Sequence, residues 1–111
     1  MDPESIRDLF AALGPVRTRR MFGGQGIYRG ERFFAIEVGG ELYLKADCLT
    51  VERFRAAGSR SFAYARGGKL ATMGYWLLPA EGADDPEEAA RWGRLALEAA
   101  DRAAKPPRAK A

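Results

Sequence analysis

The chain has 111 residues, 47% of them hydrophobic and 30% charged, which is typical of a globular protein with one domain. It has no histidine and one cysteine, which excludes an internal disulfide, serine–histidine or cysteine–histidine catalysis and the common zinc sites. The formal net charge is +3, and Lys105, Arg108 and Lys110 account for this excess. We therefore expect a neutral domain over residues 1–104 and a disordered basic tail over 105–111.

Nothing in the sequence indicates a membrane protein. No apolar run approaches the roughly 18 residues that a transmembrane helix needs. The first residues, MDPESIRD, do not place a basic segment before an apolar core, so we expect no signal peptide. The expected location is the cytoplasm.

The first predicted element is a helix that begins after Asp2. The Asp2-Pro3-Glu4 segment supplies a capping acceptor, a proline at the first helical position and an acid in the first turn. One apolar face then follows at helical spacing, formed by Ile6, Leu9, Phe10 and Leu13. Gly14-Pro15 ends the helix.

A three-stranded antiparallel meander is predicted next. Residues 21–28 indicate a strand that is interrupted by glycines, and the strand over 33–38 places Phe34, Ile36 and Val38 on one face. Gly39-Gly40 is a two-residue hairpin signal. In the strand over 41–46, Leu42 and Leu44 lie opposite Tyr43 and Lys45.

A short helix, a second hairpin and a long helix complete the prediction. The helix covers 47–57 and ends at Gly58. The hairpin strands cover 61–65 and 70–78; the second is apolar on both faces around Trp76 and stops at Pro79. The last helix starts at Asp85, and its predicted inner stripe comprises Trp92, Leu95, Ala96, Ala99 and Ala103. The order α-β-β-β-α-β-β-α predicts an α+β fold, with an antiparallel sheet of about five strands flanked by helices.

Gly23, Gly24 and Gly26 raise the question of a phosphate-binding loop. Their spacing fits neither a dinucleotide-binding nor a Walker pattern. They also follow a helix and lie inside a strand pattern, whereas a phosphate loop joins a strand to the start of a helix. We therefore favour a bent strand on which another backbone or a large side chain packs closely.

Five basic residues are candidates for contact with a partner: Arg17, Arg19, Arg20, Lys45 and Lys69. Strand alternation places Arg17 and Arg19 on one face and Arg20 on the other. The three arginines suit either a solvated strand end or a patch for an acidic partner or phosphate backbone. For Lys45 and Lys69, with Asp47 nearby, a surface ion pair is favoured over acid–base chemistry.

The aromatic residues favour a core over an exposed surface for stacking bases. This prediction covers Phe22, Tyr28, Phe33, Phe34, Tyr43, Phe62, Tyr64, Tyr75 and Trp76. For Tyr28, Tyr43 and Tyr64, the sequence pattern gives the weakest indication of whether the side chain lies in the core or on the surface. Cys48 has no histidine or second cysteine beside it, so we expect it to be a packing residue.

Five collinear segments resemble the N-terminal domain of the TfoX/Sxy family of natural competence regulators. They are RRMFGGQGIY (19–28), LYLKAD (42–47), FAY (62–64), MGYWLLP (73–79) and RWGRLALEAA (91–100). The resemblance implies a fold of the secretion-chaperone-like class and a non-enzymatic regulatory role beside the cyclic-AMP receptor protein. It implies no catalytic residue. The chain is expected to be a single-domain member that lacks the family's C-terminal domain.

The leading hypothesis is thus a protein-interaction module whose partner is a transcription regulator, such as the cyclic-AMP receptor protein, or RNA polymerase. The alternatives are direct nucleic-acid binding through Arg17, Arg19, Arg20 and the tail, or an interaction module in an unrelated pathway. A small enzyme that uses Lys45, Asp47 or Lys69 is the least favoured hypothesis. No cofactor or metal is expected, and a homodimer through the second hairpin or the strand edge near residue 21 is left open.

Overall fold

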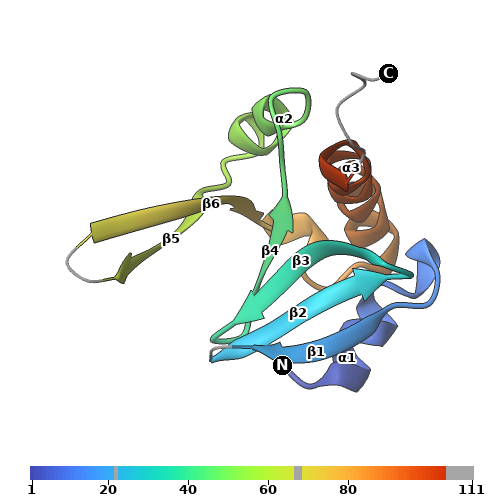
Figure 1. Ribbon diagram of the computed structural model, residues 1–111. Helices are drawn as coiled ribbons and strands as arrows, with labels where there is room; N and C mark the ends of the chain where they lie inside the picture. The colour runs from blue at the N-terminus through green and yellow to red at the C-terminus, as the bar shows by residue number, and fades with distance from the viewer. Residues whose placement is uncertain (22, 67–68, 105–111) are drawn as a thin grey trace, which may run out of the picture.

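The computed structural model describes residues 1–21, 23–66 and 69–104, and within 63–73 it describes only the backbone. Within these residues, six strands form one antiparallel sheet in the order β1-β2-β3-β4-β6-β5 (Figure 1). The strands are β1 (Arg17–Met21), β2 (Gly24–Arg29), β3 (Arg32–Val38), β4 (Glu41–Lys45), β5 (Ser61–Arg66) and β6 (Lys69–Leu77). The helices are α1 (Pro3–Leu9), α2 (Val51–Ala56) and α3 (Pro86–Ala104), with the short 3-10 helices η1 (Ala11–Leu13) and η2 (Ala80–Gly82). The α+β class is confirmed.

The N-terminal helix begins as its sequence predicts. The Asp2 carboxylate accepts a hydrogen bond from the Ser5 backbone N–H at 2.7 Å, which satisfies one of the free donors of the first turn. The four residues of the predicted apolar face are all buried, although the α-helix ends at Leu9 and the last two of them lie in or next to η1.

The expected single strand over 21–28 is wrong, because this segment belongs to two strands. Arg17 pairs with Tyr28 and Met21 pairs with Gly24, so β1 and β2 form a hairpin of their own. Gly23 has a φ of +82°, a value that glycine adopts without strain where the chain reverses. The meander therefore has four strands, and the sheet has six where about five were expected. Its edges are β1 and β5, the two regions in which a homodimer contact was considered.

A β-bulge shifts the alternation of β3. Ile27 pairs with Ala35 while Tyr28 pairs with Phe33, so Phe34 is an extra residue without a partner in β2. Phe34 therefore packs with the helices, and Phe33 lies on the face of Ile36 and Val38. The prediction that Phe34 shares a face with Ile36 and Val38 is wrong for this reason.

Turns and caps in the middle of the chain agree with the sequence. Gly39 and Gly40 have φ values of +61° and +86°, as a tight two-residue hairpin turn requires. In β4, Leu42 and Leu44 face the helices and Tyr43 faces the other side. Helix α2 is shorter than predicted, and Gly58, with a φ of +80°, terminates it.

The buried stripe of α3 differs from the predicted one. Its buried residues are all small, namely Ala89, Ala90, Gly93, Ala96, Ala99 and Ala100. Trp92 and Leu95 are only partly buried, and Ala103 is exposed. Small residues bring α3 close to η1: a Cβ atom on Gly93 would lie 2.9 Å from a methyl group of Leu13. The bulky Trp92 and Leu95 therefore lie beside the contact between α3 and η1 and not within it.

The apolar side chains form two clusters, one on each face of the sheet. The larger lies between the sheet and the helices, where α3 packs on β3 and β4 and α1 packs against α3. The smaller lies on the opposite face. At the end of β6, Trp76 and Leu78 join the larger cluster and Tyr75 and Leu77 the smaller, which confirms that this segment is covered on both faces.

Candidate functional site

The smaller cluster contains strand residues only, so among the described residues no helix covers this face of the sheet. Its buried members are Ile36, Tyr43, Phe62 and Tyr75, and its partly buried members are Met21, Phe33, Val38 and Leu77. Cross-strand pairing adds Arg17, Arg19, Tyr28 and Lys45 to the same side. We call these twelve residues the helix-free face.

Aromatic rings pack on one another across the helix-free face. Tyr28 and Phe33 are stacked with their centroids 5.0 Å apart, and Phe33 lies 5.9 Å from Tyr75. Tyr43 and Phe62 meet edge to face at 4.9 Å. The buried rings are held by their neighbours, so the rings open to a partner are the half-buried Tyr28 and Phe33.

Two predicted cations lie over rings of this face. The Arg17 guanidinium is 4.5 Å from the centre of the Tyr28 ring, and the Lys45 ammonium is 5.2 Å from that of Tyr75. Arg19 is exposed and lies opposite Gly26. Three of the five candidate partner-binding residues are thus on one face, and Arg20 lies on the other, as alternation predicts. For Lys69, only its backbone place at the start of β6 is described.

Burial and hydrogen bonding shift the ionisation of the two buried tyrosines. Burial raises the pKa of Tyr75 to about 12. The pKa of Tyr43 is also raised, by burial and then by its hydrogen bond to the Glu41 carboxylate, which accepts from the phenol at 2.7 Å. Arg60 pairs with the same carboxylate at 3.1 Å. Both phenols are therefore neutral near pH 7, and the charged members of the helix-free face are Arg17, Arg19 and Lys45.

The glycines of the second strand allow close packing, as the sequence suggests. A Cβ atom on Gly26 would lie 2.9 Å from the Phe33 ring and 3.1 Å from the Met21 methyl group. On Gly24 it would lie 2.1 Å from the backbone oxygen of Glu37. These positions serve the sheet, because no helix begins beside them to form a phosphate loop. Trp76 packs near Phe54, and Pro79 is buried two residues after the end of β6, so both have structural roles.

Asp47 forms an ion pair, although not with Lys45, and the packing role expected for Cys48 is wrong. The Asp47 carboxylate pairs with Arg102 of α3 at 2.6 Å instead of with Lys45, and this bond lowers the pKa of Asp47. Cys48 is exposed because it lies in the turn before α2. Within the described residues, no group of histidine, cysteine or acidic side chains could hold a metal ion.

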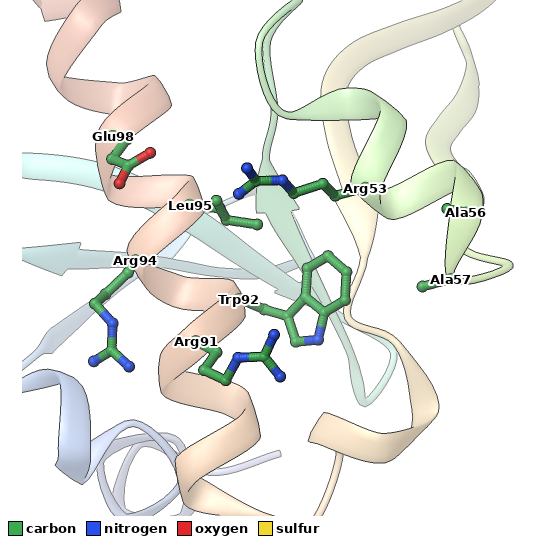
Figure 2. A pocket seen from close by; sticks show the side chains of 8 residues that line it. All are labelled: Arg53, Ala56, Ala57, Arg91, Trp92, Arg94, Leu95 and Glu98. Atoms are coloured by element: carbon green, nitrogen blue, oxygen red, sulfur yellow. The ribbon is translucent and has the colours of Figure 1, made fainter.

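A cavity between α2 and α3 escaped sequence analysis. It has a volume of about 670 Å³ and is lined by Arg53, Ala56, Ala57, Arg91, Trp92, Arg94, Leu95 and Glu98 (Figure 2). Its residues come from two helices whose relative placement no local pattern encodes. The only signal in the sequence is the run of arginines along the polar side of α3.

Comparison with known proteins identifies the family of this chain. The family model for the TfoX N-terminal domain matches residues 8–100. The chain belongs to the TfoX N-terminal domain family. A search of curated proteins finds no match. In this TfoX N-terminal domain, the segment RRMFGGQGIY forms most of the β1–β2 hairpin and LYLKAD forms β4 and the residues after it. The segment RWGRLALEAA lies in the middle of α3, so the segments on which the resemblance rests build the core and the helix-free face.

Part of the prediction concerns residues that the structure does not describe. Phe22, the ring of Tyr64, the side chain of Lys69 and the tail over 105–111 lie outside the described residues. Among the described helices, none is long and apolar enough to cross a membrane.

Proposed function

We propose that the protein is a regulatory, non-enzymatic interaction domain and that its helix-free face binds a protein partner. The proposal is supported first by membership of the TfoX N-terminal domain family. The observation that carries it is the apolar cluster on a sheet face that no described helix covers. Partly exposed apolar groups with charges at their margin are typical of sites at which proteins associate.

The chemistry of the face favours an apolar partner surface with acidic groups. Met21, Phe33, Val38 and Leu77 offer apolar area that water still reaches. Arg17, Arg19 and Lys45 place positive charge at the margins of this area. In keeping with the resemblance, the proposed partner belongs to the transcription machinery: a regulator such as the cyclic-AMP receptor protein, or RNA polymerase. The proposed process is expression of the genes for DNA uptake.

Two neighbouring arginines supply a matched test. Arg19 and Arg20 are both exposed and adjacent in β1, but they face opposite sides of the sheet. We expect immobilised wild-type protein to capture a transcription regulator or a polymerase subunit from an extract of its own cells. Arg19→Glu should reduce this capture about tenfold or more, because it places a like charge against an acidic partner. Arg20→Glu should leave capture unchanged. Equal loss in both variants would contradict the assignment of the face.

A second candidate function is direct nucleic-acid binding. The observation that favours it is the stacked Tyr28–Phe33 pair with Arg17 over one ring, since sheets that bind single strands combine aromatic and basic groups. The neutral charge of residues 1–104 favours the protein partner instead. Fluorescence anisotropy with a labelled single strand, at several salt concentrations and with residues 105–111 removed, separates the two. Salt-sensitive binding that persists without the tail would favour nucleic acid.

A further inference from the structure

The cavity between α2 and α3 lies on the helix side of the sheet, away from the helix-free face. Its volume of about 670 Å³ is within the range of small-molecule sites, which is about 300–1,000 Å³. Both helices contribute to its wall, so a ligand that fills it would contact α2 and α3 together (Figure 2).

Positive charge dominates the rim of the cavity. Arg53 of α2 and Arg91 and Arg94 of α3 line it, together with a single acid, Glu98. Arg91 pairs with Glu88 at 2.9 Å. The guanidinium groups of Arg53 and Arg94 have no ion-pair or hydrogen-bond partner in the described part of the chain. Figure 2 shows the guanidinium groups of Arg53 and Arg91 turned into the space between the two helices, whereas that of Arg94 points away from them. The guanidinium groups of Arg53 and Arg91 can therefore attract an anion into the cavity, and their paired N–H groups match carboxylate and phosphate oxygens.

The base of the cavity is apolar and holds an unsatisfied donor. Trp92 packs against the buried Phe54 ring, with the ring centres 4.8 Å apart, and Leu95 lies beside it. The Trp92 Nε1–H is buried and has no acceptor among the described residues, which is uncommon for a buried polar group. Figure 2 shows the Trp92 indole between Arg53 and Arg91, in the space between the two helices.

We propose that this cavity binds a small organic anion in which a flat apolar body carries a carboxylate or phosphate group. The body lies against Trp92 and Leu95, and the anionic group accepts hydrogen bonds from Arg53 and Arg91. Such a ligand joins α2 to α3 and stabilises the position of α2. This site is independent of the partner surface proposed above, since the two lie on opposite faces of the sheet.

The indole N–H resonance of Trp92 reports binding directly. The chain has two tryptophans, so a nitrogen–proton spectrum of the labelled protein shows two indole signals, which through-bond experiments assign. We would titrate with phenyl phosphate and with phenylacetate, and compare phenol and inorganic phosphate. We expect at least one aromatic anion to shift the Trp92 signal saturably, with the Trp76 signal nearly constant, and to raise the Tm. Phenol and inorganic phosphate alone should each bind at least about tenfold more weakly, because each makes only half of the contacts.

Charge-removing variants supply the control. Arg53→Gln and Arg91→Gln should each weaken binding of the aromatic anion about tenfold, the usual effect of losing a charge-assisted hydrogen bond. Arg7→Gln removes the same charge from an exposed position on α1, away from the cavity, and should change binding less than twofold. The proposal is overturned if neither aromatic anion gives saturable binding, if phenol binds as tightly as they do, or if Arg7→Gln has the same effect as Arg53→Gln. Capture of the protein partner should be unchanged in Arg53→Gln, which keeps the two proposals distinguishable.

Discussion

Replacing Gly24 with alanine tests how closely β2 and β3 approach. The added Cβ atom would lie 2.1 Å from the backbone oxygen of Glu37, whereas a carbon and an oxygen atom come into contact at about 3.3 Å. The overlap of roughly 1 Å involves backbone, so no side-chain rotation relieves it, and the strands must separate at this end. Overpacking costs about 1–3 kcal/mol, and we expect the upper value, about 3 kcal/mol. For a chain of this length, that corresponds to a fall in Tm of about 12 °C.

Gly30→Ala is the matched control for this variant. Gly30 has a φ of +60° and no atom within 4 Å of an added Cβ, so the substitution introduces conformational strain without overlap. The left-handed conformation costs alanine about 1 kcal/mol, and both variants lose the same flexibility in the unfolded chain. Thermal and urea denaturation followed by circular dichroism would measure the difference. If Gly24→Ala is no less stable than Gly30→Ala, the close approach of β2 and β3 is refuted.

Three further predictions concern stability and ionisation. Phe54→Ala empties a fully buried site between the two tryptophan rings and should cost about 3–5 kcal/mol, measured by urea denaturation; a loss under 1 kcal/mol would contradict this packing. Burial would raise the pKa of Glu37, but hydrogen bonds from Gln25 and Gly40 outweigh it, and the folded pKa is lowered. The stability from Glu37 is therefore complete above its ordinary pKa of about 4.3 and is lost as pH falls through the lower folded value, so Glu37→Gln should flatten the acid side of the stability profile. An unchanged profile would contradict the assignment. Tyr75 should ionise near pH 12. In a pH titration followed by tyrosinate absorbance, Tyr75→Phe should therefore remove the ionisation step that occurs at the highest pH.

Local signals in the sequence predicted those parts of the fold that depend on neighbouring residues. Asp2 and Pro3 start α1, Gly39-Gly40 reverse the chain with positive φ values, and Gly58 ends α2. In each case, the conformational preference of one or two residues determines where the helix or strand begins or ends. The segments that carry the family resemblance are also short local stretches, and all five lie within the matched residues 8–100.

The errors occurred where contacts between distant segments decide the structure. The bulge at Phe34 changes which side chains share a face, although nothing in the alternation of 33–38 announces it. Asp47 has a lysine two residues away, yet its partner is Arg102, which α3 brings near from the other end of the chain. The buried face of α3 consists of small residues around Gly93, where the helix closely approaches Leu13. The largest apolar side chains of α3 lie outside this buried face.

The candidate site was predictable only in part, for the same reason. Arg17, Arg19 and Lys45 were identified as candidates, and alternation correctly separated Arg20 from its neighbours. Their common location depends on the strand order of the sheet, which places β1 and β4 in one surface. The cavity between α2 and α3 depends on the packing of two helices that are separated by a hairpin, so no spacing in the sequence reveals it.

The central claim is that the helix-free face binds a protein partner of the transcription machinery. The most direct test is methyl-resonance mapping of the labelled domain with the partner that it captures. We predict that the methyl signals of Met21, Val38 and Leu77 shift or broaden on addition of the partner, because these partly exposed groups lie on the face. The signal of Leu97, a partly buried residue of α3, should stay unchanged. Changes at Leu97 and none at the other three would show that the partner binds the helices and would contradict the account.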